Sequence, residues 1–185
     1  IYDVVILPGV FGEELDCDQY ETLRLFEDAI VFIHGNPTPP NVSYDLTLET
    51  IRNIYNEGGN FFWDETQMEP IIPTFWFNEL AEQLEHLFDI RGCAKDIFSS
   101  EGYDNPVMAA SMNGVNGAVL FPVHYSFLGG YVGVNGDVIS VDGVLPTENS
   151  IADGTYPLSI VYYAVYSADN PIAEQVAIEL KNIVQ

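Results

Sequence analysis

The segment most informative about architecture reads Val141-Asp-Gly-Val-Leu-Pro-Thr, continues with Gly154-Thr-Tyr-Pro-Leu, and ends with Ser159-Ile-Val-Tyr-Tyr-Ala-Val-Tyr. The last run is rich in β-branched and aromatic residues and is the most strand-like in the chain. Ile172 to Val184, which follows Asn170-Pro171, has the apolar spacing of an amphipathic helix. We therefore expect a strand followed by a terminal helix.

The same alternation extends toward the N-terminus. Apolar runs predict buried strands at 3–7 and 29–34, and further strands at 70–77 and 118–121. Helical spacing predicts helices at 46–55, with Thr47 as N-cap, at 79–89 and at 105–112. The Asn135-Gly136 dipeptide favours a hairpin that brings Val132 and Val134 beside Val138 and Ile139. Alternating strands and helices without a linker or repeat predict one α/β fold.

These segments, read in order, resemble the phosphate-type solute-binding proteins of ABC transporters. The quoted run from Val141 to Leu158 carries the most specific resemblance, because both residue types and spacing agree. Further matches are Asp3-Val-Val-Ile, Ala29-Ile-Val-Phe-Ile with Asn36-Pro, the helix at 46–55 with Trp63 after it, and Asn116-Gly-Ala-Val-Leu-Phe.

The resemblance implies a type II periplasmic-binding-protein fold, with two α/β lobes joined by crossing strands around a ligand cleft. In that arrangement residues 29–154 form the second lobe, and residues 1–28 and 155–185 form an incomplete first lobe. The family's initial first-lobe strands, with their glycine- and serine-rich loop, have no counterpart here. The expected partners are a small solute and either an ABC permease or the missing first-lobe segment, and the expected location is outside the cytoplasm.

One departure from the family concerns the residues that bind the anion. The resemblance places an Arg and a Ser-Gly-Thr turn after the strand at Ile71-Ile-Pro, whereas this chain reads Thr74-Phe-Trp-Phe-Asn-Glu-Leu. Glu79 in that window would oppose a dianion if it lay close to it. We therefore expect phosphate binding to be weakened or lost.

Charge excludes one large class of function. The chain has 28 acidic and 5 basic side chains, a formal net charge of -23, which repels nucleic acid and anionic lipid. No apolar stretch reaches the length of a membrane span, and Ile1-Tyr-Asp-Val-Val-Ile-Leu lacks the basic flank of a signal peptide. We expect no nucleic-acid binding and no membrane insertion.

Five residues are candidates for ligand contact: Thr74, Phe75, Trp76, His124 and Tyr125. The aromatic side chains after Ile71 occupy the stretch where the family presents its anion donors, so they could line a cleft for an apolar or sugar-like solute. Simple core packing is the alternative for these rings. His124 lies beside a strand that should approach the cleft, so it could donate to a ligand, although a structural, hydrogen-bonded histidine is the commoner role.

Metal and catalytic sites find little support. Cys17 and Cys93 lack zinc-ligand spacing, and the run Glu13-Glu-Leu-Asp-Cys-Asp lacks EF-hand spacing and fits a solvated helix N-terminus. Neither His86 nor His124 has a nucleophile nearby in sequence, so we expect no enzyme, no metal and no cofactor. The leading interpretation is a noncatalytic solute-binding-like domain. The alternative is an interaction or sensor domain that keeps the fold without a small ligand.

Overall fold

The computed structural model describes residues 4–9, 20–35, 44–57, 61–63, 71–75, 78–88, 98–99, 118–128 and 137–184. Its strands are β1 (Val4–Pro8), β2 (Tyr20–His34), β3 (Asp45–Leu46), β4 (Ile71–Phe75), β5 (Phe98–Ser99), β6 (Ala118–His124), β7 (Asp137–Val138), β8 (Ser140–Val141) and β9 (Ser159–Ser167). Its helices are α1 (Leu48–Glu57), α2 (Asn78–Leu87), α4 (Tyr125–Leu128), α5 (Glu148–Ala152) and α6 (Pro171–Val184).

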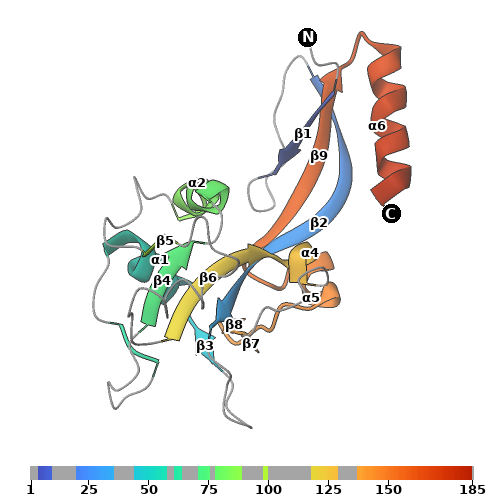
Figure 1. The fold of residues 1–185 in the computed structure, drawn as a ribbon. Helices are drawn as coiled ribbons and strands as arrows, with labels where there is room; N and C mark the ends of the chain where they lie inside the picture. The colour runs from blue at the N-terminus through green and yellow to red at the C-terminus, as the bar shows by residue number, and fades with distance from the viewer. Residues whose placement is uncertain are drawn as a thin grey trace.

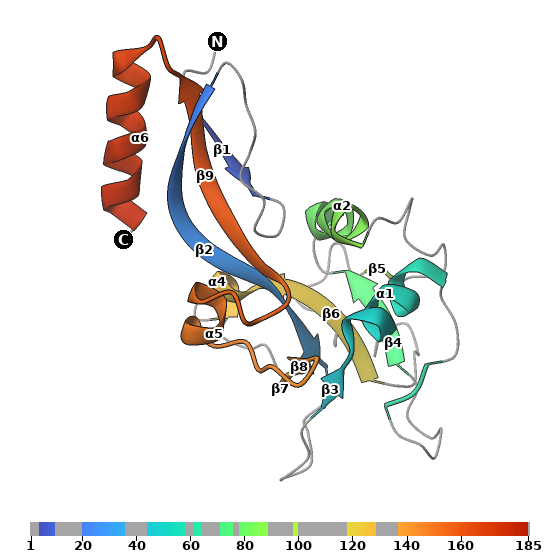
Figure 2. The same ribbon diagram turned by 180° about the vertical axis from the view of Figure 1, so that it is seen from behind.

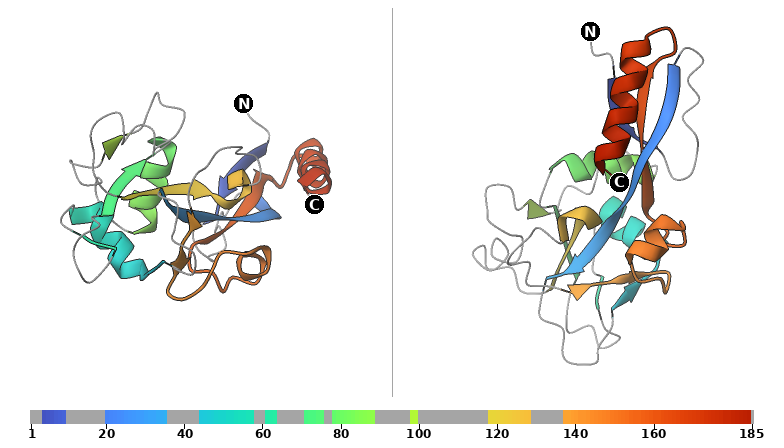
Figure 3. Two further views of the ribbon diagram at one scale, coloured as in Figure 1. Left: turned by 60° about the horizontal axis from the view of Figure 1, so that its bottom comes forward. Right: turned by 90° about the vertical axis from the view of Figure 1, so that its right-hand side faces the viewer.

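A single mixed sheet organises the molecule. Its strand order is β1-β9-β2-β6-β4-β5, β7 also pairs with β2, and β3 and β8 form a small parallel pair. The long strands β2 and β9 are antiparallel and run from the body that contains α1 and α2 to the end where β1 and α6 lie (Figure 1, Figure 2). These two strands therefore connect two regions of the fold, as the side view in Figure 3 also shows.

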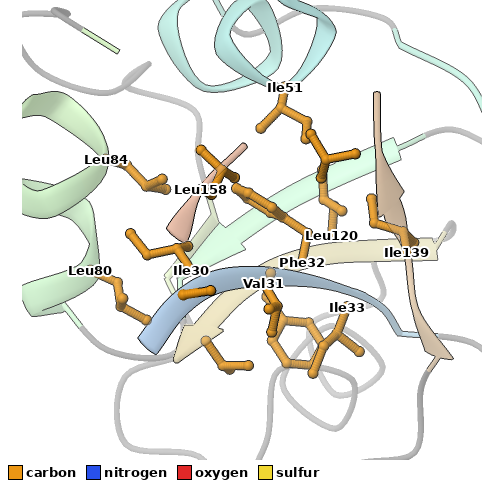
Figure 4. Close-up of a cluster of buried hydrophobic side chains, with 14 of the residues drawn as sticks. Ile30, Val31, Phe32, Ile33, Ile51, Leu80, Leu84, Leu120, Ile139 and Leu158 are labelled. Carbon is orange, nitrogen blue, oxygen red and sulfur yellow. The ribbon is translucent and has the colours of Figure 1, made fainter. Parts of the chain in front are cut away.

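The larger hydrophobic core lies between the sheet and the helices α1 and α2 (Figure 4). Four consecutive β2 residues, Ile30, Val31, Phe32 and Ile33, are 0% exposed, because this part of the strand is covered on both faces. Helices and neighbouring strands supply the facing side chains, among them Ile51, Leu80, Leu84, Leu120, Ile139 and Leu158. A continuous apolar run is typical of a strand buried in this way.

A second, smaller core lies at the other end of β2 and β9. It joins Leu25, Ala164 and Tyr166 of the strands to Ala173 and Ala177 of α6. Both helix alanines are fully buried, so the small side chains let α6 approach the sheet closely. The two cores therefore lie toward opposite ends of the paired strands β2 and β9.

Several predicted elements are confirmed. The Thr47 Oγ1 accepts a hydrogen bond from the Thr50 N–H at 3.1 Å, which is the geometry of an N-cap, and α1 starts at the next residue. Ile51 and Ile54 on this helix are buried as their spacing predicts. The predicted helix at 79–89 corresponds to α2, and the terminal strand and helix to β9 and α6.

The Val141 to Thr147 segment acts as a brace between distant parts of the chain. Asp142 has φ 50 and Gly143 has φ 76, and a glycine adopts this left-handed conformation at low cost. The Gly143 N–H donates to Asp45 Oδ1 at 2.9 Å, which ties the turn to the strand before α1. Thr147 is the N-cap of α5 and forms a capping box with Ser150. The sequence analysis did not predict this short helix.

Two sequence predictions about strands need correction. The strand predicted as buried at 3–7 is present as β1 but is exposed, with Val5, Ile6 and Leu7 at 42%, 47% and 38%. It is an edge strand, and apolar composition alone does not distinguish an edge from a covered strand. The strand predicted to start at Ala29 starts at Tyr20 in the structure. The sequence analysis missed its first part because that part is half-exposed and has no continuous apolar run.

Several predictions lie outside the described residues. They are the helix at 105–112, the first half of the hairpin at Asn135-Gly136, the acidic run at 13–18, Cys17, Cys93 and Trp76. The second half of that hairpin, β7, pairs with Ile33 and His34 of β2.

Among the described helices, none combines the length and apolar character that a membrane crossing would need.

Candidate functional site at the carboxyl ends of β4 and β6

The sheet brings four of the five predicted ligand residues to one edge. β4 and β6 are parallel neighbours, with Pro73 opposite Leu120, so both strands end on the same side. Thr74 and Phe75 end β4, His124 ends β6, and Tyr125 opens α4. In open α/β sheets, ligands bind outside the carboxyl ends of strands, which makes this edge the candidate site.

Thr74 has an interior position at this edge. The residue is 0% exposed, and its carbonyl accepts a hydrogen bond from the Tyr55 hydroxyl at 3.3 Å. The same hydroxyl donates to the carbonyl of Leu120 at 3.0 Å, so the Tyr55 side chain of α1 links β4 to β6. Ligand contact by the Thr74 side chain remains a prediction, and its burial makes a packing role the simpler one.

Asp28 is a buried carboxylate at this edge that the sequence analysis missed. It lies on β2 and is 5% exposed. Its Oδ1 accepts from the Ser126 N–H at 3.1 Å and from the Ala29 N–H at 2.8 Å, and its Oδ2 accepts from the Ser126 hydroxyl at 2.7 Å. The Glu27-Asp28 pair directly before a buried apolar strand was the available signal in the sequence.

These bonds join elements that are far apart in the chain. Asp28 and Ser126 are separated by 98 residues, and their contact fixes the start of α4 against the crossing strand. Because the three donors satisfy a charge that would otherwise be costly to bury, Asp28 acts as an anchor of the edge.

His124 lies beside this carboxylate. Its Nδ1 is 3.7 Å from Asp28 Oδ2, its side chain is 17% exposed, and its ring centroid is 6.2 Å from that of Phe127. Burial lowers the pKa of His124 below its ordinary 6.5, and the charge of Asp28 raises it in part. The imidazole is therefore neutral near pH 7, and it offers hydrogen bonds rather than a positive charge.

Tyr162 of β9 lies near the same carboxylate. Burial and the charge of Asp28 both raise the pKa of Tyr162, so its hydroxyl stays protonated. Its ring stacks on Phe26, with centroids 4.8 Å apart and an interplanar angle of 12°. The edge thus combines one carboxylate, a neutral imidazole and a neutral phenol.

No cation of the described residues belongs to β4, β6 or α4. The described cations are Arg24 on β2, Arg52 on α1 and Lys181 on α6. Arg24 forms an ion pair with Glu27. Within the ranges given above, no group of three or more His, Cys, Asp or Glu side chains could hold a metal ion.

A separate cavity of about 480 Å³ lies where the crossing strands meet α5. Arg24 and Glu27 of β2 line one side, and Asp153, Gly154 and Tyr156 line another. Tyr156 is buried, and its hydroxyl donates to the carbonyl of Ile30 at 3.2 Å. None of the residues predicted to contact a ligand lines this cavity, which lies on the crossing segment itself.

Buried aromatic contacts surround His34, a second feature that the sequence analysis missed. His34 is 1% exposed, and its ring stacks on Tyr44 with centroids 4.1 Å apart. Trp63 meets the same ring edge-on at 4.6 Å. The residues come from β2 and two loops, so their contact depends on tertiary structure.

Comparison with known proteins identifies the kind of fold that this chain has. No protein-family model matches the chain, and no curated protein sequence matches it. Similar solved structures include an ABC-type phosphate transport receptor from Vibrio cholerae, with TM-score 0.69, 17% identity, and coverage of 97% of this chain and 73% of that one. A putative phosphate ABC transporter substrate-binding protein from Clostridium perfringens, with bound phosphate, has TM-score 0.62, 18% identity, and coverage of 96% and 72%.

PstS from Borrelia burgdorferi is similar as well, with TM-score 0.61, 13% identity, and coverage of 97% and 72%. Other similar structures are regulatory domains, at TM-scores under 0.5. The chain therefore has a mixed α/β fold of the type II periplasmic-binding-protein kind. The predicted fold class is confirmed, and at these identities the likeness concerns the fold alone.

Proposed function

We propose that this chain is a noncatalytic solute-binding domain related to the phosphate receptors of ABC transporters, with an altered binding edge. The proposal rests on the whole-chain likeness to a phosphate transport receptor, which covers 97% of this chain. It rests also on the position of the predicted ligand residues at the carboxyl ends of β4 and β6, where such folds bind ligands.

The chemistry of the edge supports a solute other than phosphate. The sequence from Thr74 to Leu80 contains no Arg, Ser or Gly. Within the described part of the edge the ionised group is the carboxylate of Asp28, and His124 is neutral because burial lowers its pKa. A negative edge repels a dianion, so a neutral solute that receives hydrogen bonds and aromatic contacts fits better.

The division into lobes is part of this proposal. Residues 29–154 would form the second lobe, and residues 1–28 with 155–185 the incomplete first lobe. The two separate hydrophobic cores support the division, since Leu25 and Ala164 lie in the small core and Ala29 and Ile30 in the large one. Tyr156, Leu158 and Ile160 also pack into the large core, so by packing the C-terminal boundary between the lobes would lie between Ile160 and Ala164 and not at residue 155.

Partners and location follow from the same comparison as proposals. A domain of this kind would act outside the cytoplasm and deliver its solute to an ABC permease. About a quarter of each solved receptor's length lies outside the region that this protein matches, consistent with a first lobe completed by a further segment.

Thermal unfolding with added ligands tests the proposal. Phosphate should leave the melting temperature unchanged, whereas a ligand at 100 times its Kd would add about 2.7 kcal/mol of stability. A panel of sugars, amino acids and oxyanions would then identify the solute class. A shift with phosphate would contradict the altered edge. For any solute that binds, His124→Gln should weaken the shift and His86→Gln, on the exposed surface of α2, should not.

A second candidate is an interaction or sensor domain that keeps the fold without a small ligand. The observation that favours it is the exposed apolar strand β1, which is unusual for a surface that contacts only water. Silence of the whole ligand panel, with an intact cooperative unfolding transition, would favour this candidate over solute binding.

A further inference from the structure

A β-bulge in β2 places two opposite charges on one face of the crossing strands. The pairing with β9 shifts register after Arg24, which leaves Leu25 without a residue opposite it. Residues three apart in a regular strand point to opposite faces, but this extra residue brings Arg24 and Glu27 to the same face. Their partners in β9, Tyr163 and Val161, are two apart and share that face. Bulges are over-represented next to active sites because they redirect side chains in this way.

These four side chains line the cavity of about 480 Å³ between β2, β9 and α5, here called the crossing cavity. The opposite wall is formed by the end of α5 and the turn after it, and α5 lies beside the paired strands (Figure 1, Figure 2). The volume is within the range of sites that hold small molecules. None of the lining residues belongs to β1, so the cavity does not depend on the edge strand of the sheet.

The wall combines apolar surface with a fixed carboxylate. Pro157, together with Val161 of β9, supplies half-buried apolar surface. Asp153 supplies the carboxylate. Its Oδ1 accepts hydrogen bonds from the Thr155 N–H at 2.9 Å and from the Thr155 hydroxyl at 2.7 Å, which fix its orientation. The cavity therefore presents one guanidinium, two carboxylates and an apolar patch.

The two charges from β2 are accessible to a ligand. Arg24 forms an ion pair with Glu27, and their side chains are 54% and 31% exposed. An exposed ion pair contributes little to stability, so a ligand can replace each partner with a group of the same charge at low cost. A lone anion in the cavity meets the carboxylates of Glu27 and Asp153, and a lone cation meets the guanidinium of Arg24. A ligand that carries both charges satisfies all of these groups.

We propose that the crossing cavity binds a small zwitterion of the α-amino acid class with an apolar side chain. Its carboxylate binds the guanidinium of Arg24 in bidentate geometry, and its ammonium group binds Glu27 beside the ring of Tyr163. Its side chain packs against Pro157 and Val161. This site is separate from the edge at β4 and β6, because none of the residues that form that edge lines the cavity, and it does not rest on the proposed function.

NMR titration of the isotope-labelled chain with L-leucine tests the proposal, in enough NaCl to screen nonspecific attraction of cations to the acidic surface. Backbone signals of Arg24, Glu27 and Gly154 should shift with one common Kd. Leucinamide lacks the carboxylate, and isocaproate lacks the ammonium group. Each should bind about 10-fold or more weakly than L-leucine, because each loses one charged hydrogen bond.

Variants test the roles of the two charges. Arg24→Gln and Glu27→Gln should each weaken L-leucine binding by a similar factor. Arg52→Gln, which removes an equal charge from an exposed residue of α1, should bind like the parent. Urea unfolding without ligand should be close to the parent for all three variants, since the ion pair is exposed.

The signals of Ser126 and Phe127 separate this site from the edge at β4 and β6, and they should not move. If L-leucine shifted these signals and left those of the crossing cavity in place, the amino acid would be a solute of the edge. That result would overturn this proposal while supporting the proposed function. The absence of any shift with L-leucine, or equal binding by the Arg24→Gln variant, would also overturn it.

Discussion

At the scale of single residues, the candidate site is organised by Asp28. This carboxylate is buried beside His124 and Tyr162, and it raises the pKa of both, while burial lowers the pKa of the histidine and raises that of the tyrosine. Its hydrogen bonds come from Ser126 and from the backbone of Ala29. The result is a hydrogen-bonded edge that bears negative charge at neutral pH.

Protonation of His124 should destabilise the protein at mildly acidic pH. Because burial lowers the folded-state pKa below 6.5, the unfolded chain binds the proton first as the pH falls. The contribution of a neutral His124 is complete above pH 6.5 and is lost between 6.5 and the lower folded-state pKa. Urea unfolding from pH 8 to 5 should show this decrease. The His124→Gln variant should lose less stability over this pH range than the parent. The His86→Gln variant, changed at an exposed residue, should lose as much as the parent.

The charge of Asp28 should be visible in the titration of its neighbour. Asp28→Asn removes the interaction that raises the pKa of His124, so the histidine should titrate at a still lower pH. NMR titration of the imidazole protons measures this directly, and His124→Gln identifies the signal. An unchanged or higher pKa of His124 in the Asp28→Asn variant would show that the two groups do not interact as the structure places them.

Loss of the Asp28 anchor should be costly. Asp28→Ala leaves the Ser126 N–H and hydroxyl without their acceptor, and hydrogen bonds to charged groups contribute about 1.5–3 kcal/mol each. Asp153→Ala is the control, because Asp153 is exposed and bonds only locally to Thr155 among the described residues. Urea unfolding should give a loss of about 2 kcal/mol or more for Asp28→Ala and a much smaller one for Asp153→Ala.

At the scale of elements, the turn at Asp142-Gly143 and the short helix α5 show how local and distant interactions combine. The capping box of Thr147 and Ser150 is local, whereas the turn before it is tied to Asp45 near α1. Ile151 of α5 is buried in the large core. A helix of five residues has little stability of its own, so it persists because it is capped and packed.

Removal of the cap should weaken this element. Thr147→Ala deletes the oxygen that accepts from the Ser150 N–H at 3.1 Å, and N-cap replacements cost about 1 kcal/mol. Asn149→Ala, exposed on the same helix, is the matched control and should change the free energy of unfolding by less than about 0.5 kcal/mol. Equal effects of the two substitutions in urea unfolding would argue against the capping role.

At the scale of the whole molecule, repulsion arising from the net charge of -23 is the dominant long-range interaction. Few cations offset it, and within the described ranges Arg24 is the one placed in an ion pair with a carboxylate side chain. Repulsion among the surface carboxylates opposes the compact state, and added salt screens it.

Stability should therefore increase with ionic strength. Raising NaCl from about 0.02 M to 0.5 M shortens the screening length several-fold, and each 1 kcal/mol gained raises the Tm of a domain of this size by about 2–4 °C. A Tm that is flat or falls across the series would mean that charge repulsion is not a major cost in the folded state.

The sequence by itself determined the alternation of strands and helices, and with it the α/β fold. Helix α1 with its Thr47 cap, α2, the strand at 29–34 and the terminal pair β9 and α6 could all be predicted, because their apolar spacing and caps are local. The resemblance carried by Val141 to Leu158 pointed to the same fold as the solved structures. The strand predicted at 118–121 continues in the structure to His124, and Tyr125 opens α4.

Tertiary structure alone decided which surfaces are covered. The apolar strand β1 is exposed because it is the last of the described strands on its side of the sheet, and the role of Asp28 depends on a contact with Ser126, 98 residues away. The His34 contacts likewise join residues from separate segments. Local spacing reports how a segment folds on itself, whereas burial and pKa depend on neighbours that the folded chain brings from far along the sequence.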